Sequence, residues 1–135
     1  WLDARDHKYV EEVGTSNAFF MIDDEVITAP LGGSILPGVT RDSTITLLKK
    51  WGYKESERKL SIDDIEAASK NGTLQEAWAT GTACVISPIG YLRYKGEDIV
   101  INNGNVGALS QKLYDTIYGM QTGVVPDDMG WIVQI

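Results

Sequence analysis

The sequence predicts an α+β domain with a mostly antiparallel sheet and flanking helices. Two pairs of short apolar segments are each joined by a tight turn, which is the pattern of β-hairpins. Other segments repeat their apolar residues at helical spacing. The hairpin pairs are residues 17–22 with 25–28 and 91–94 with 98–101, and two of the helical segments are 40–51 and 108–120. Because hairpin strands pair antiparallel, helices and an antiparallel sheet in one chain predict the α+β class.

The first hairpin begins with a buried strand. Asn17–Ile22 is an almost continuous apolar run that stops at the acidic turn Asp23-Asp24. Glu25–Thr28 is predicted as its return partner, and Pro30 ends that strand. A glycine-containing loop follows over residues 32–38.

The middle of the chain predicts two helices around a short strand. The first helix covers 40–51 and stops at Gly52, and the strand covers 54–59. The first helix presents the apolar residues Ile45, Leu47, Leu48 and Trp51 on one side. Residues 61–64 read Ser-Ile-Asp-Asp, the form of a capping box, and predict a second helix that ends near Asn71-Gly72.

Residues 73–76 read Thr-Leu-Gln-Glu, which also has the capping-box form. The pattern predicts a short helix that runs to Trp78. After it, the apolar run 83–87 predicts a fully buried strand.

The last third of the chain begins with the second hairpin, at 91–94 and 98–101. Residues 102–104 read Asn-Asn-Gly and predict a turn. Residues 108–120 predict an amphipathic helix, and 131–135 predict a final strand.

Composition excludes several classes of protein. A chain of 135 residues with 43% hydrophobic and 23% charged residues fits one globular domain. The net charge of −7 argues against nucleic-acid binding, which needs a basic face. The apolar runs are shorter than the roughly 20 residues of a membrane span. The single cysteine, Cys84, cannot form an internal disulfide, so we expect a cytoplasmic protein.

Three segments combine small residues with a hydroxyl beside the end of a helix or strand. They are Glu12–Asn17, Ile35–Arg41 and Glu76–Pro88. Small residues expose backbone N–H groups, and the start of a helix attracts negative charge. The three segments together therefore predict a site for an anionic cofactor.

In this order, the three segments closely resemble the C-terminal half of branched-chain amino-acid aminotransferases, which are class IV pyridoxal-phosphate enzymes of the D-amino-acid-aminotransferase-like fold. The resemblance covers Trp1 to Ile135. It implies that residues 1–135 form one C-terminal, cofactor-binding domain. It also implies that the smaller N-terminal domain and the Schiff-base lysine lie upstream of residue 1. None of the lysines in this chain matches that catalytic position, so we expect no catalytic residue here.

The first segment supplies a carboxylate for the cofactor ring. Glu12 stands just before a buried strand and close to Gly14, although by itself it could be an ordinary solvated glutamate. The resemblance implies that Glu12 faces the pyridine nitrogen and that Thr15 lines the ring. A carboxylate there favours the protonated, electron-withdrawing ring. Glu11 is the adjacent alternative, but the match to Gly14-Thr15 selects Glu12.

The second segment runs straight into a predicted helix, whose first N–H groups are free to bind an anion. The resemblance implies that Val39 and Thr40 bind the cofactor phosphate and that Leu36 packs on the ring. From the local sequence alone, a plain turn with Thr40 as the helix N-cap is an equal alternative. The resemblance places the arginine that binds the phosphate upstream of this chain, so Arg41 is expected to be structural.

The third segment contains Gly81, which allows close approach of the backbone to a ligand. The resemblance implies that Thr82 helps to hold the phosphate and that the backbone N–H groups of Thr82 and Ala83 hold the substrate carboxylate. A simple turn is the alternative. If the resemblance holds, the start of the Thr40 helix and the Gly81-Thr82 turn must meet at one concavity. Animal members carry Cys-x-x-Cys where this chain has Cys84 and a serine, so Cys84 is expected to be a buried core residue.

Other polar residues have simpler interpretations. The only histidine, His7, is expected at the surface or in packing. Asp63-Asp64 is explained by helix capping, and no histidine or cysteine joins the pair to make a metal site.

The resemblance implies that the parent enzyme is a homodimer that transfers an amino group between leucine, isoleucine or valine and 2-oxoglutarate. The chain alone is expected to be inactive and not to retain pyridoxal 5'-phosphate. Two alternatives stay open: a D-amino-acid transaminase or lyase of the same fold, and a non-catalytic folded module.

Overall fold

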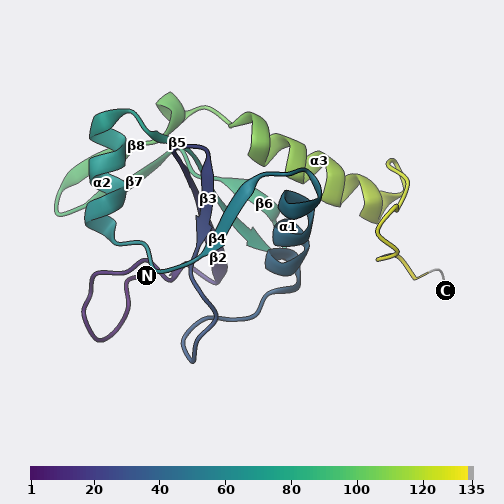
Figure 1. The fold of residues 1–135 in the computed structure, drawn as a ribbon, viewed down its shortest axis with the longest axis horizontal. Helices are drawn as coiled ribbons and strands as arrows, with labels where there is room; N and C mark the ends of the chain where they lie inside the picture. The colour runs from purple at the N-terminus through teal and green to yellow at the C-terminus, as the bar shows by residue number, and fades with distance from the viewer. Residues whose placement is uncertain (134–135) are drawn as a thin grey trace.

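The computed structural model describes residues 1–133 and contains a central sheet with helices on both faces (Figure 1). The strand order is β4-β3-β2-β5-β6, and a short strand, β1, also pairs with β2. The strands of this sheet are β1 (Glu12–Val13), β2 (Ser16–Ile22), β3 (Glu25–Thr28), β4 (Lys54–Glu57), β5 (Leu74–Gly81) and β6 (Val85–Pro88). The remaining elements are the hairpin β7 (Tyr91–Tyr94) and β8 (Glu97–Val100), the 3-10 turn η1 (Asn102–Gly104), and the helices α1 (Val39–Lys50), α2 (Ile62–Asn71) and α3 (Ala108–Thr122).

Helix α2 and the β7-β8 hairpin lie on one side of the sheet, and α1 and α3 lie on the other (Figure 1). Because side chains alternate along a strand, neighbouring residues of β2 enter different cores. Phe20 packs with α2 and the hairpin, whereas Phe19 packs with α1 and α3. The sheet is therefore buried on both faces, which explains the almost continuous apolar sequence of β2.

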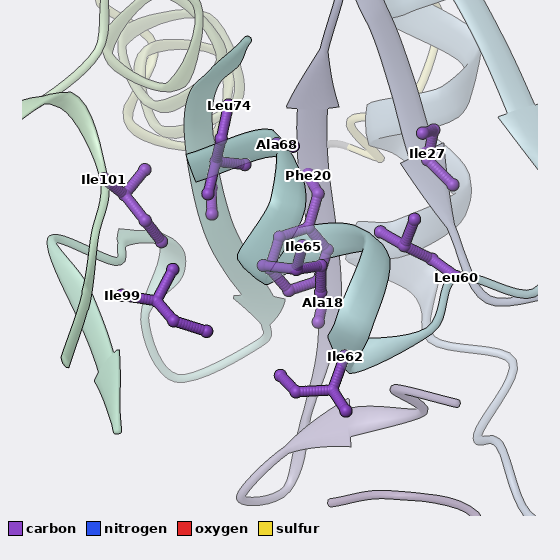
Figure 2. Close-up of a cluster of buried hydrophobic side chains, with 11 residues drawn as sticks. Ala18, Phe20, Ile27, Leu60, Ile62, Ile65, Ala68, Leu74, Ile99 and Ile101 are labelled. Atoms are coloured by element: carbon purple, nitrogen blue, oxygen red, sulfur yellow. The ribbon is translucent and has the colours of Figure 1, made fainter. Parts of the chain in front are cut away.

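The core on the α2 side is shown in Figure 2. Ile62, Ile65 and Ala68 of α2 cover Ala18 and Phe20 of β2. Ile99 and Ile101 close this core from the side of the hairpin. The core on the other face is built around Trp78 of β5, whose ring stacks on Phe19 with a centroid distance of 5.6 Å.

The predicted α+β class and the mostly antiparallel sheet are confirmed. Among the described strands only β4 pairs parallel, with β3, because α1 carries the chain back before β4 begins. The predicted capping box of α2 is also present: the Asp64 N–H donates to Ser61 Oγ, and the helix ends at Gly72 in the left-handed conformation.

The predicted helix over residues 73–78 is wrong. Residues 74–78 belong to β5, which is paired on both edges, with β2 and β6. Thr73 does not cap a helix, because its hydroxyl donates to the Ala68 carbonyl instead. Pairing along two edges and the complete burial of Trp78 outweigh a local capping pattern, which is typically worth about 1 kcal/mol.

Two further predictions need correction. The final strand does not form over Trp131–Val133, where the Ile132 N–H donates to the Asp127 carboxylate at 2.7 Å instead of joining a sheet. The rest of that predicted strand, residues 134–135, lies outside the described residues. Strand β6 begins at Val85, so Cys84 lies in a turn and is half-buried rather than part of the core. His7 is exposed, as expected.

Candidate functional site

A row of three polar residues crosses the sheet close to the start of α1. Glu12 of β1 is paired with Asn17 of β2, and Asn17 is paired with Thr80 of β5. Directly opposite residues on antiparallel strands point to the same face of the sheet. The three polar side chains therefore occupy one end of the sheet on a common face, although the strands come from distant parts of the sequence.

Two distant turns meet at a cavity of about 250 Å³ beside this row. The segment that leads into α1 forms one side, and the turn between β5 and β6 forms the other. The lining residues are Thr15, Asn17, Leu36, Pro37, Gly38, Val39, Thr40, Thr80, Gly81 and Thr82. The structure thus brings together the start of the Thr40 helix and the Gly81-Thr82 turn at one concavity, as the resemblance predicts.

The N-terminus of α1 opens on this cavity without a side-chain cap. Gly38 is the N-cap residue, so the alternative in which Thr40 caps the helix is excluded. The first N–H groups of an α-helix have no partner within the helix, and they carry the positive end of its dipole. These groups and the threonines of the lining make the cavity suited to an anion.

A second feature of the same cavity is a buried hydroxyl group. Thr80 lines the cavity and is 1% exposed, and its Oγ1 atom has no hydrogen-bond partner within residues 1–133. Buried hydroxyl groups are normally paired, and an unpaired one costs about 1–3 kcal/mol. An orphaned hydroxyl is the kind of local imperfection that functional sites retain.

Two apolar side chains of the cavity face solvent. Leu36 is 65% exposed and Val39 is 75% exposed, and both line the cavity. Together with Pro37 they give the cavity an apolar wall next to its donors. A flat ring that carries an anionic group fits such a combination.

Glu12 adjoins the cavity but does not line it. Its Oε1 atom accepts hydrogen bonds from the Leu36 N–H at 3.0 Å and from Asn17 Nδ2 at 3.3 Å. Glu11 is turned elsewhere, toward the Ser34 hydroxyl, which donates to it at 2.8 Å. The selection of Glu12 over Glu11 is therefore consistent with the geometry. Ala83 is exposed in the β5-β6 turn and does not line the cavity.

Arg41 points away from the cavity. One of its guanidinium nitrogens donates to the Ala29 carbonyl at 2.9 Å and to the Glu57 carboxylate at 2.6 Å. The side chain is buried between α1 and the sheet. Its contacts are structural, as expected from the sequence.

Sequence reasoning missed Asn17 as a residue of this site. A signal was present, because asparagine is depleted in strands and the residue stands within a buried apolar run. Thr80 was also missed, although it stands next to the Gly81-Thr82 pair. Thr80 lies two residues after Trp78, so both side chains point to the same face of β5. The mistaken helix over residues 73–78 concealed this alternation.

The family model described as amino-transferase class IV matches residues 4–91, which contain β1 to β6 and the whole cavity lining. The chain belongs to the class IV aminotransferase family. Relatives of this class IV chain include the branched-chain-amino-acid aminotransferase 2 of Bacillus subtilis, 53% identical over 135 residues, and a probable branched-chain-amino-acid aminotransferase of Staphylococcus aureus, 50% identical over 135 residues. All of this chain is aligned in both cases, but it spans only 37% and 38% of the lengths of these relatives.

Solved structures show the same fold. The branched-chain amino acid aminotransferase of Escherichia coli matches with a TM-score of 0.78 and 30% identity, over 98% of this class IV chain and 41% of that one. The T.th. branched-chain amino acid aminotransferase with pyridoxamine 5'-phosphate matches with a TM-score of 0.77 and 27% identity, over 98% of this chain and 40% of that one. The predicted fold family is thereby confirmed.

Two further findings concern metal-binding groups and membrane-spanning helices among the described residues. No group of three or more histidine, cysteine, aspartate or glutamate side chains within residues 1–133 is placed to hold a metal ion. None of the helices described has the length and apolar character to cross a membrane.

Proposed function

We propose that this chain forms the cofactor-binding part of a branched-chain amino-acid aminotransferase that uses pyridoxal 5'-phosphate. The observation that carries the proposal is the cavity where the uncapped start of α1 meets the Gly81-Thr82 turn. The names of relatives that are at least 50% identical over the full chain support the substrate class. The neighbour that holds pyridoxamine 5'-phosphate supports the cofactor.

The residues present fit a phosphate-bearing ring. The first N–H groups of α1 and the hydroxyls of Thr40 and Thr82 would hold the phosphate, because both threonines line the cavity beside the positive helix end. Leu36 and Thr15 would line the ring. The buried Thr80 hydroxyl, which lacks a partner among the described residues, is consistent with a polar group bound nearby.

Glu12 would face the ring nitrogen from the end of β1. When bound, the cofactor supplies a conjugated ring that withdraws electrons from the substrate, and this ability depends on a protonated nitrogen. The Glu12 carboxylate favours that protonated form by its charge. The backbone N–H groups of Thr82 and Ala83 would hold the substrate carboxylate at the exposed rim of the turn.

The proposal extends to the whole protein. Residues 1–135 would be the C-terminal domain, with the lysine that holds the cofactor supplied by an upstream segment. We further propose a cytoplasmic homodimer that transfers the amino group of leucine, isoleucine or valine to 2-oxoglutarate. The single cysteine supports the cytoplasmic location, because it can form no internal disulfide.

A chimera tests the substrate class. This chain would replace the aligned residues of the Bacillus subtilis relative, and amino transfer to 2-oxoglutarate would be measured with leucine, isoleucine, valine and D-alanine. Transfer from the three branched-chain amino acids is expected. Activity with D-alanine alone would identify a D-amino-acid transaminase instead, and the absence of all transfer in a folded, cofactor-loaded chimera would favour a non-catalytic module.

The cofactor site is tested in the same chimera, because the chain alone is not expected to retain pyridoxal 5'-phosphate. Binding of pyridoxal 5'-phosphate is compared with that of pyridoxal, which lacks the phosphate, and with that of the Thr40→Val and Thr82→Val variants. The phosphate-free compound and both variants are expected to bind at least about tenfold more weakly, since each loses one charge-assisted hydrogen bond or more. Equal binding of pyridoxal and its phosphate ester would contradict the site.

A further inference from the structure

Asn17 is a buried polar residue at the centre of the row Glu12-Asn17-Thr80. Its side chain is 4% exposed. The Nδ2 group donates to the Leu36 carbonyl at 2.9 Å and to Glu12 Oε1 at 3.3 Å. The amide thus donates one proton to a residue of strand β1 and the other to the loop before α1.

Glu12 and the loop are also joined directly. The Leu36 N–H donates to Glu12 Oε1 at 3.0 Å, and the Leu36 carbonyl accepts from Asn17. Both backbone polar groups of Leu36 are therefore held by side chains of the sheet. These three residues form a closed set of hydrogen bonds, which we call the Asn17 clamp. In such a set each bond orients the others, so the loss of one member weakens the whole.

The other end of the Asn17 amide lies against Gly38. A Cβ atom added at Gly38 would stand 2.4 Å from Asn17 Oδ1, which is too close for any real contact. Only glycine allows the loop to approach the amide this closely. Because Gly38 is the N-cap of α1, Asn17 contacts the chain where the phosphate-binding turn begins.

We propose that Asn17 is a positioning residue that holds the Glu12 carboxylate and the Leu36–Thr40 turn in one fixed arrangement. In this arrangement Glu12 can contact the ring nitrogen while the turn contacts the phosphate of the same cofactor. The role rests on the function proposed above. In this role Glu12 Oε1 takes part in the clamp. Glu12 Oε2 makes no hydrogen bond within the described residues, so it is the oxygen that would face the ring nitrogen.

The clamp is tested first without any ligand. Hydrogen exchange at the Leu36 amide is measured by NMR in the chain and in the Asn17→Ala variant. Protection of this amide is expected to fall by about tenfold or more, the equivalent of one hydrogen bond, while the core amides of Phe19 and Trp78 keep theirs. The matched control is Asn102→Ala, which removes an exposed amide bond to the Asn105 carbonyl and must leave Leu36 protected.

A second variant approaches the clamp from the loop. Gly38→Ala places a methyl group against Asn17 Oδ1 and is expected to lower Leu36 protection as Asn17→Ala does, even if the latter folds poorly. Unchanged Leu36 protection in either folded variant would overturn the clamp. This result does not depend on the cofactor, so it is separate from any failure of the proposed function.

The link to the cofactor is tested with pyridoxamine 5'-phosphate labelled with ¹⁵N in the ring. In the chimera with the Bacillus subtilis relative, the bound ring nitrogen is expected to stay protonated to a higher pH than in the free compound. Asn17→Ala and Glu12→Gln are each expected to lower that pH. In the double variant, Asn17→Ala should add nothing to Glu12→Gln, because Asn17 acts through Glu12. A purely structural role would give additive or unrelated shifts and would overturn the positioning role. If the chain shows the exchange effect but the folded chimera binds no pyridoxamine 5'-phosphate, the proposed function alone is overturned.

Discussion

The carboxylate of Glu76, on strand β5, accepts a hydrogen bond of 2.9 Å from the backbone N–H of Ser110 in the first turn of α3. Its other oxygen accepts from the Leu109 N–H at 3.0 Å. The N-cap residue of α3 is Gly107, which has no side chain to cap the helix, and a Cβ there would collide with Glu76. A buried strand residue thus caps a helix that lies more than thirty positions later in the chain.

This relationship predicts that Glu76→Gln destabilises the fold by about 1–3 kcal/mol, because an amide supplies only one acceptor and loses the charge that the helix dipole favours. Urea unfolding measures the change. The control is Glu97→Gln on the exposed hairpin, which should stay within about 0.5 kcal/mol of the unchanged chain. Equal stability of both variants would show that the cap contributes nothing.

The Leu36 side chain is expected to contribute to ligand binding and not to the stability of the fold. Leu36→Ser should change the free energy of unfolding by no more than about 0.5 kcal/mol, since the side chain is already exposed to water. In the chimera with the Bacillus subtilis relative, the same substitution should weaken binding of pyridoxal 5'-phosphate by about three- to tenfold, because the ring loses an apolar wall. Val124→Ser, at another exposed apolar position, is the control and should leave binding unchanged. A large loss of stability in Leu36→Ser would contradict this interpretation.

Arg41 is expected to stabilise the fold. Removing a buried charged group leaves the Ala29 carbonyl without its donor and Glu57 without its partner. We expect Arg41→Ala to cost about 2–3 kcal/mol, less than the 3–5 kcal/mol of a fully buried pair, because Glu57 is 39% exposed. Urea unfolding tests this, with the exposed Arg5→Ala as control. A change below about 0.5 kcal/mol would show that the Arg41 contacts are dispensable.

The N-terminal segment should respond to acid through Asp3. Hydrogen bonds from the backbone N–H groups of Tyr9, Lys8 and Asp6 lower the pKa of the Asp3 carboxyl from 3.8 to about 2. A pKa that is depressed in the folded state stabilises above the unfolded value and loses this effect as the pH falls. The stability difference between the chain and Asp3→Asn should therefore be constant above about pH 5 and decrease progressively as the pH falls from about 4 through about 2.

Urea unfolding at a series of pH values measures this difference. Asp6→Asn provides the control, since Asp6 accepts no backbone hydrogen bond within the described residues. A difference for Asp3→Asn that persists unchanged at pH 2 would show that the carboxylate is not held by these N–H groups.

Local signals were sufficient for several elements. Helix α2 was predicted with its capping box at Ser61 and its stop at Gly72, because both ends are specified by residues within one turn of the helix. The hairpin of β2 and β3 was predicted from two apolar runs around Asp23-Asp24. In the site, the sequence identified the two turns, since small residues and hydroxyls mark them without reference to the rest of the fold.

What the sequence determined by itself is the set of strands and helices whose ends carry their own signals, and the family to which the three motifs belong. The tertiary structure decided the rest. The Thr-Leu-Gln-Glu pattern has the form of a cap for its own helix, yet Glu76 caps α3, because pairing with β2 and β6 makes residues 74–81 a strand. The Asn17 clamp likewise joins a strand to a loop through side-chain contacts between distant segments. Such contacts have no local signature, because their free energy is gained only when the sheet brings those segments together.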